Sequence, residues 1–250
     1  LGTGDEELYR QFCLGRADAV LIDPGDRPPL PAATAIGSPE NEPALQVYFL
    51  AAALPGLDVE NPRQVSAWRY PRQYGPKSPL FSRGTILRLN GTQQFLISGT
   101  ASVVGHQTHH ENQVANQLSE SLRNVRSLLE EGHRLMGDAR ASLDSDGTLK
   151  VYVRDAEDFE LIRATMDREA PAEIPRIYLL GDICRENLLT EIDGILNCRK
   201  PRSRKNPAPP GFASFAETVI RSFASTAIDR SFRSESLTIL RSPRPLRISF

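Results

Sequence analysis

Residues 110–131 carry the strongest structural signal in the chain, a long amphipathic helix. The apolar side chains of this segment recur at helical spacing and form one stripe: Val114, Leu118, Leu122, Val125 and Leu129. A helix with a single apolar stripe must bury that stripe against another element. The segment therefore predicts a helix that covers one face of a packed domain.

Strand patterns lie on both sides of this helix. Before it, residues 84–102 form two strand-like runs around Asn90-Gly91, which suit the positive φ angles of a tight hairpin turn. After it come a strand over 147–155, an amphipathic helix over 156–170 and a strand pair within 175–196. The order β-β-α-β-α-β-β predicts an α/β (α+β) domain, with helices packed on one face of a mixed β-sheet.

The first part of the chain is less regular. Residues 5–20 predict an amphipathic helix, and 31–37 and 44–54 predict strands, the second apolar enough to be buried on both faces. Residues 58–84 form a long loop with several prolines. Loops of this length are more often functional than passive, and the prolines could hold Tyr70 and Tyr74 as walls of a pocket.

Composition limits the partners and the compartment. The chain has three cysteines, no CxxC pair and no apolar run near the roughly 20 residues of a membrane helix, so we expect a cytoplasmic protein without a membrane partner. Residues 199–250 hold eleven Lys/Arg and three Asp/Glu, a charge of +8, whereas the first 198 residues carry −9. The tail carries no known nucleic-acid-binding motif, so no nucleic-acid partner is expected.

Three groups near the end of the predicted domain are candidates for a site. Arg176, Cys184 and Glu191 could be ordinary residues of a sheet edge, with the acid facing water. They could equally line a pocket in which Glu191 delivers a proton and Arg176 and Arg83 clamp carboxylates through their planar guanidinium groups. Spacing alone leaves both readings open.

A metal site is not expected. His106, His109 and His110 could supply three nitrogens, but no cysteine or spaced set of carboxylates completes a ligand set.

Several long blocks in the right order resemble the chorismatase family. They include "YRQFCLGRADA", "WRYPRQYGPKSPLFSRG", "FLISGTASVVGHQTHHENQVANQLSESLRNV" and "RIYLLGDICRENLLTEID", and the likeness runs from about Tyr9 to Leu196. The chain is most similar to the hydroxybenzoate-forming branch, which is tied to xanthomonadin and ubiquinone precursors. The β-β-α-β-α-β-β part also resembles the reactive-intermediate deaminase superfamily.

The resemblance implies an activity and a site. Chorismatases cleave chorismate to pyruvate plus a hydroxybenzoate or a dihydroxycyclohexadienoate, without a metal or organic cofactor. It implies Glu191 as general acid and Arg176, fifteen residues earlier, as a carboxylate anchor, with Arg83 as a second. Gly99 and Cys184 match the hydroxybenzoate branch, in which Gly99 leaves room beside the ring and Cys184 shapes the pocket or assists removal of a ring proton.

The resemblance also implies a division of the chain. Residues 1–80 would be the end of a truncated first domain and a connecting loop, and 81–198 the catalytic deaminase-like domain. Residues 199–250 match nothing in the family, and their Ser- and Arg-rich composition with weak periodicity predicts a disordered basic tail. A homo-oligomer is one expectation for the assembly. Three alternatives remain: a hydrolytic chorismatase, an enamine or imine hydrolase that uses the same Arg and Glu, and an inactive truncated paralogue.

Overall fold

The structure, a computed structural model, describes residues 7–19, 30–38, 45–52, 54–89, 92–137, 141–143 and 146–198. The chain divides into a compact unit of Leu1–Pro39 with Ala52–Pro201 and a second unit of Glu40–Ala51 with Arg202–Phe250. All helices and strands described below belong to the first unit. The predicted tail lies outside the described residues, and the predicted domain boundaries remain predictions.

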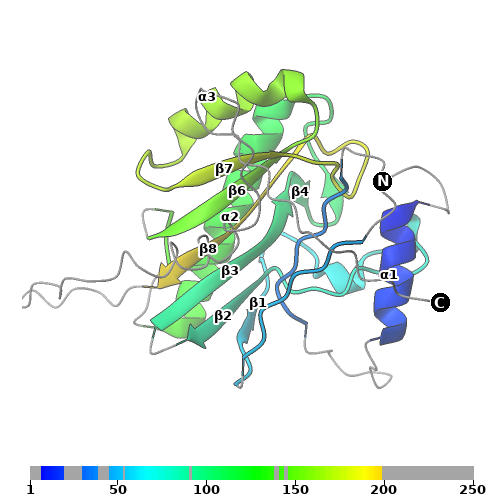
Figure 1. Cartoon of the computed structure of the whole chain (residues 1–250), viewed down its shortest axis with the longest axis vertical. Coiled ribbons are helices and arrows are strands. Elements are labelled where there is room, and N and C mark those ends of the chain that lie inside the picture. The colour runs from blue at the N-terminus through cyan, green and yellow to red at the C-terminus, as the bar shows by residue number, and fades with distance from the viewer. Residues whose placement is uncertain are drawn as a thin grey trace, which may run out of the picture. The chain divides into compact units, whose positions relative to one another are not determined.

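Six strands form one sheet in the order β1-β2-β3-β8-β6-β7 (Figure 1). Their bounds are β1 Leu57–Val59, β2 Gly84–Leu89, β3 Thr92–Ala101, β8 Thr190–Cys198, β6 Gly147–Val153 and β7 Arg176–Leu180. Neighbouring strands are antiparallel except β6 and β7, which are parallel and therefore need a crossover connection. The predicted mixed sheet is confirmed. A separate two-stranded ladder joins β4 (Val103–Val104) and β5 (Gln107–Thr108).

Helices α2 (Val114–Met136) and α3 (Phe159–Glu169) cover one face of this sheet, as predicted (Figure 1). Short 3-10 turns lie at η1 Ala67–Arg69, η2 Arg72–Tyr74 and η3 Ala156–Asp158. Helix α2 begins four residues later than the predicted 110, because His110 and Asn112 have φ of 59°, which a right-handed helix cannot contain.

The core lies between α2 and the sheet. Fully buried side chains from both layers form it: Leu118, Leu122, Val125 and Leu128 from α2, and Phe95, Leu149, Val151, Ile192 and Leu196 from the strands. Each buried side chain of this size contributes roughly 2 kcal/mol through its removal from water. Because strand side chains alternate between faces, the residues between these core positions point to the opposite face, and that face carries the candidate site.

Two predictions for the first part of the chain are wrong. Residues 31–37 form no strand; they run beside the sheet and make two isolated bridges, Ala32 to Ser82 and Gly37 to Asp182. Residues 45–52 form no strand either, and their apolar side chains are exposed, Phe49 by 88%. Apolar content predicted burial, but it does not specify a pairing partner. The predicted first helix is confirmed as α1, Leu8–Ala19.

Within the described residues, no helix is long and apolar enough to cross a membrane.

Candidate active site

Glu191 lies in the middle of the sheet. It sits on β8, opposite Ala101 of β3 on one side and Tyr152 of β6 on the other. Its neighbour Ile192 points into the helix-side core, so Glu191 points to the other face. Glu191 is only 5% exposed, and it makes no side-chain hydrogen bond with a described residue. The reading in which this carboxyl faces water is therefore excluded.

A bulge in β3 brings the backbone close to this carboxyl. The register between β3 and β8 shifts between Ile97 and Thr100, and such a bulge redirects the residues within it. A side-chain carbon at Gly99 would overlap Oε1 of Glu191. The amide of Gly99 donates to Oγ1 of Thr34 at 3.0 Å, which holds this part of the bulge in place. Gly99 is therefore needed so that Glu191 can occupy its position.

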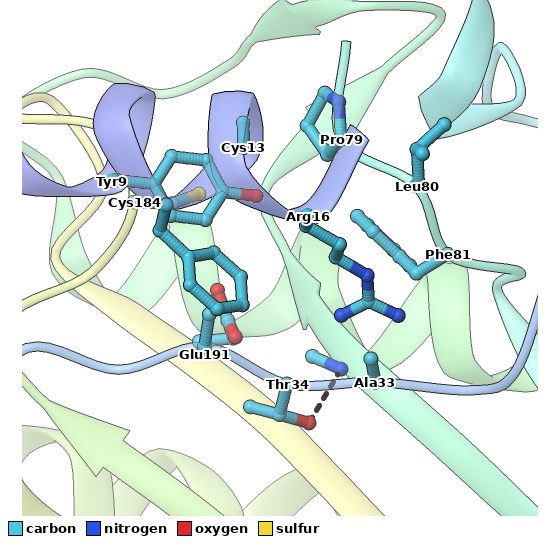
Figure 2. A pocket seen from close by; sticks show the side chains of 13 residues that line it. Tyr9, Cys13, Arg16, Ala33, Thr34, Pro79, Leu80, Phe81, Cys184 and Glu191 are labelled. Carbon is cyan, nitrogen blue, oxygen red and sulfur yellow. Dashed lines mark hydrogen bonds between the residues drawn. The ribbon is translucent and has the colours of Figure 1, made fainter. Parts of the chain in front are cut away.

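Helix α1 closes a small pocket over Glu191 (Figure 2). The pocket has a volume of about 40 Å³ and is largely apolar, with Phe12, Pro79, Leu80 and Phe81 among its walls. Arg16 of α1 enters the same pocket as Glu191 (Figure 2). Its guanidinium is half-buried and forms no ion pair with a described residue, and burial lowers its pKa. A cation in this state is suited to an anionic ligand.

A wide cleft adjoins the small pocket. It has a volume of about 880 Å³, within the range usual for ligand sites. Glu191 also lines this cleft, and so do five other residues of the small pocket: Tyr9, Pro79, Phe81, Gly99 and Cys184. The carboxyl of Glu191 thus lies where the two cavities meet.

Arg83 supplies one cation of the wide cleft. It is 4% exposed, and its Nη2 donates to the carbonyl of Val65 at 2.8 Å and to the hydroxyl of Tyr70 at 2.6 Å. Its Nε is buried without a hydrogen-bond partner in the described part of the chain. A buried donor left unpaired costs free energy, so Arg83 is prepared to bind an acceptor from a ligand.

Arg185 supplies a second cation that the sequence patterns did not single out. Its guanidinium lies 3.9 Å from the ring centroid of Tyr74 and 5.1 Å from that of Tyr70. Its Nη1 donates to the carbonyl of His106 at 2.9 Å. Tyr70 and Tyr74 line the cleft, and their rings hold the guanidinium of Arg185 in its wall. In the sequence, the only indication that Arg185 belongs to the site is its position directly after Cys184.

The protonation states of the two acidic groups follow from burial. Desolvation, with the charge of Asp193 in addition, raises the pKa of Glu191 to about 8, although Arg83 acts in the opposite direction. Glu191 is therefore largely protonated at pH 7. Desolvation and the neighbouring Glu191 raise the pKa of the Cys184 thiol to about 12, so this thiol stays neutral.

Comparison with known proteins matches this site to one family. Residues 2–51 match the family model of the N-terminal part of FkbO/Hyg5-like chorismatases. The chain is 37% identical over 197 residues to a 3-hydroxybenzoate synthase of Streptomyces hygroscopicus, covering 76% of this chain and 57% of that protein. It is 39% identical over 199 residues to a chorismatase of Streptomyces rapamycinicus, covering 76% and 58%. A chorismatase crystal structure superposes with a TM-score of 0.63 at 33% identity, covering 76% of this chain and 58% of the other.

The chain belongs to the chorismatase family. It spans somewhat more than half the length of the chorismatases that it matches.

One residue that the chorismatase likeness placed in the site is not there. Arg176 pairs in register with Leu149, whose side chain is in the helix-side core, so Arg176 and Glu191 lie on opposite faces of the sheet. Its Nη2 donates to the carbonyl of Pro171 at 2.8 Å, and its Nη1 lies 3.5 Å from Asp167 of α3. The prediction that Arg176 and Glu191 converge on one cavity is wrong, and the cations near Glu191 come from Arg16, Arg83 and Arg185 instead.

The histidines have other contacts. Nδ1 of His106 lies 3.1 Å from the hydroxyl of Tyr74, and Nε2 of His110 lies 3.7 Å from Glu120. Among the described residues, no group of three His, Cys, Asp or Glu side chains is arranged to hold a metal ion.

Proposed function

We propose that this protein cleaves the enolpyruvyl ether of chorismate to give pyruvate and 3-hydroxybenzoate, with Glu191 as the general acid. The observation that carries the proposal is the position of Glu191, a buried carboxyl without a hydrogen-bond partner among the described residues, where two cation-lined cavities meet. The likeness to the Streptomyces 3-hydroxybenzoate synthase supports the choice of substrate and product.

Substrate binding follows from charge. Chorismate carries a ring carboxylate and an enolpyruvyl carboxylate, so it requires two cationic anchors. Arg83 and Arg185 in the wide cleft receive one carboxylate, and Arg16 in the small pocket receives the other. The ether between the two carboxylates then lies against Glu191, at the junction of the cavities.

The first chemical step is protonation of carbon. The carboxyl of Glu191 transfers its proton to the methylene carbon of the vinyl ether; the C=C electron pair forms the new C–H bond and leaves an oxocarbenium ion. The carboxylate that remains stabilises this cation through its opposite charge. A carboxyl with a pKa of about 8 carries the required proton at neutral pH, whereas one with its ordinary value of 4.5 would not.

The next step decides the product. In the hydroxybenzoate route, the hydroxyl of the ring displaces the side chain, and loss of a ring proton then makes the ring aromatic. Gly99 leaves the space that the carboxyl of Glu191 occupies, and the neutral thiol of Cys184 lines the same cavity. Capture of the cation by water would instead give the dihydroxycyclohexadienoate.

The test is incubation of the protein with chorismate, with pyruvate measured through lactate dehydrogenase and ring products separated by chromatography. We expect equal amounts of pyruvate and 3-hydroxybenzoate. The diol as the main product would indicate the hydrolytic route, and 4-hydroxybenzoate a different ring outcome. A folded protein that binds chorismate but releases no pyruvate would refute the proposal, and hydrolysis of an enamine or imine would then be tested in its place.

A further inference from the structure

A second carboxylate lies on the same face of the sheet as Glu191. Asp193 is 3% exposed, and its Oδ2 accepts hydrogen bonds from Nζ of Lys150 at 3.0 Å and from the hydroxyl of Tyr152 at 2.9 Å. Nζ of Lys150 also donates to the oxygen of Tyr152 at 3.0 Å. The three side chains form one closed hydrogen-bonded group, which we term the Asp193 group.

The sheet places the Asp193 group directly beside the candidate acid. Asp193 follows Glu191 by two residues on β8, about 7 Å along the strand. Lys150 is the cross-strand partner of Asp193, and Tyr152 is the cross-strand partner of Glu191. The four residues thus occupy a two-by-two block on the site face, and backbone pairing fixes their mutual positions.

The two carboxyl groups have opposite surroundings. Oδ2 of Asp193 accepts a hydrogen bond from Nζ of Lys150, whose side chain is 43% exposed. Glu191 has no hydrogen-bond partner among the described residues. Two carboxylates this close in a desolvated site do not both ionise readily, and the one that is paired with a cation keeps the negative charge.

We propose that Asp193, held as an anion by Lys150 and Tyr152, is a positioning residue that keeps Glu191 in its acid form. The proposal rests on the function proposed above for Glu191. Asp193 transfers no proton itself; its charge makes the ionised form of Glu191 less favourable. The direction agrees with the contribution of Asp193 to the raised pKa of Glu191.

The cations around Glu191 act against this effect, and its neighbouring tyrosine and cysteine side chains are neutral. The cations that line its two cavities favour ionisation: Arg16 of α1, Arg83 before β2, and Arg185 before β8. The neighbouring titratable groups Tyr9, Cys13, Cys184 and Tyr152 all have raised pKa values and are neutral near pH 7. Glu7, Glu111, Glu186 and Arg10 line the wide cleft as well. Asp193 is the anion whose charge contributes to the pKa of Glu191.

The test is a pH titration of Glu191 by infrared difference spectroscopy. The C=O band of the protonated carboxyl is assigned to Glu191 by its disappearance in the Glu191→Gln variant. In Asp193→Asn, which keeps the shape but removes the charge, we expect the pKa of Glu191 to fall by about 1 pH unit. If chorismate is turned over, the rate of this variant falls about fivefold at pH 8 and is unchanged at pH 5.5. A pKa of Glu191 that is equal in Asp193→Asn and wild type would overturn the proposal.

Two controls isolate the charge. Glu160→Gln removes one negative charge from an exposed position on α3, where Glu160 pairs with Arg163, and should leave the pKa of Glu191 unchanged. Tyr152→Phe removes one hydrogen bond but keeps the charge of Asp193, so the pKa should stay within about half a pH unit.

A measurement on the wild-type protein covers the case in which Asp193→Asn does not fold. With ¹³C-labelled aspartate, no protonated band from a buried aspartic acid should be present at pH 7, whereas the glutamic acid band should be. Asp193 is the one buried aspartate among the described residues, so a protonated band from a buried aspartic acid at pH 7 would overturn the proposal. None of these spectra requires turnover, so failure of the proposed function and failure of this inference are distinguishable.

Discussion

Replacement of Glu191 by glutamine should remove a large pH dependence from the stability of this protein. Glutamine has the shape of a protonated glutamic acid but cannot ionise, so the variant represents the acid form at every pH. In wild type, the carboxyl ionises at its ordinary pKa of 4.5 when the chain is unfolded and at about 8 when it is folded. The folded-state pKa is the higher of the two, so the proton on Glu191 stabilises the folded protein. Its contribution to the free energy of unfolding is fully present below pH 4.5. It is lost as the pH rises towards 8.

The size of the effect follows from the two pKa values. Each factor of ten in an ionisation constant corresponds to about 1.4 kcal/mol, so the full loss is roughly 5 kcal/mol, of which about 4 kcal/mol falls between pH 5 and pH 9. The assay is urea unfolding of wild type and Glu191→Gln at a series of pH values. We expect the variant to gain about 4 kcal/mol relative to wild type between pH 5 and pH 9. Parallel stability curves for the two proteins would refute the reasoning, because they would show that Glu191 ionises as freely in the folded state as in water.

Three further substitutions test the geometry. Gly99→Ala should lower kcat/KM for chorismate at least about tenfold, because the added methyl group overlaps Oε1 of Glu191; unchanged pyruvate release would contradict this. Arg154→Lys should raise KM about tenfold and lower the Tm, because Arg154 shapes the loop that carries Cys184 and Arg185. Its guanidinium donates to the carbonyls of Ile183, Arg185 and Leu188 and pairs with Asp182. A shift in Tm alone would mean that this loop does not bind substrate. Arg176→Lys should change KM less than about twofold, because Arg176 lies on the helix side of the sheet; a tenfold increase in KM would show that it serves the site.

The elements of the second half of the chain could be predicted because their signals are local. The apolar stripe of α2 repeats within the helix itself, and the strands on each side of Asn90-Gly91 carry their turn residues between them. The start of α2 was missed because the positive φ of His110 and Asn112 depends on how the preceding loop packs, which no residue pattern shows.

The site required information that spacing does not contain. Arg176 and Glu191 are fifteen residues apart, but the loop between β7 and β8 lies between them, so their separation cannot fix which face each residue occupies. Arg16 lies on a helix far away in sequence, and only tertiary folding brings it to Glu191. The sequence left open whether the carboxyl of Glu191 faces water or lines a pocket. The residues that bury it come from β3, β6 and α1, which are distant in sequence.

The most direct test of the proposed role of Glu191 is the rate of pyruvate release from chorismate by wild type and Glu191→Gln, measured across pH 5–9 with chorismate binding followed in parallel by calorimetry. We expect the wild-type rate to fall above about pH 8, and the variant to bind chorismate but release pyruvate at least about a thousandfold more slowly. A variant that retains the wild-type rate and pH profile would show that the proton comes from another group.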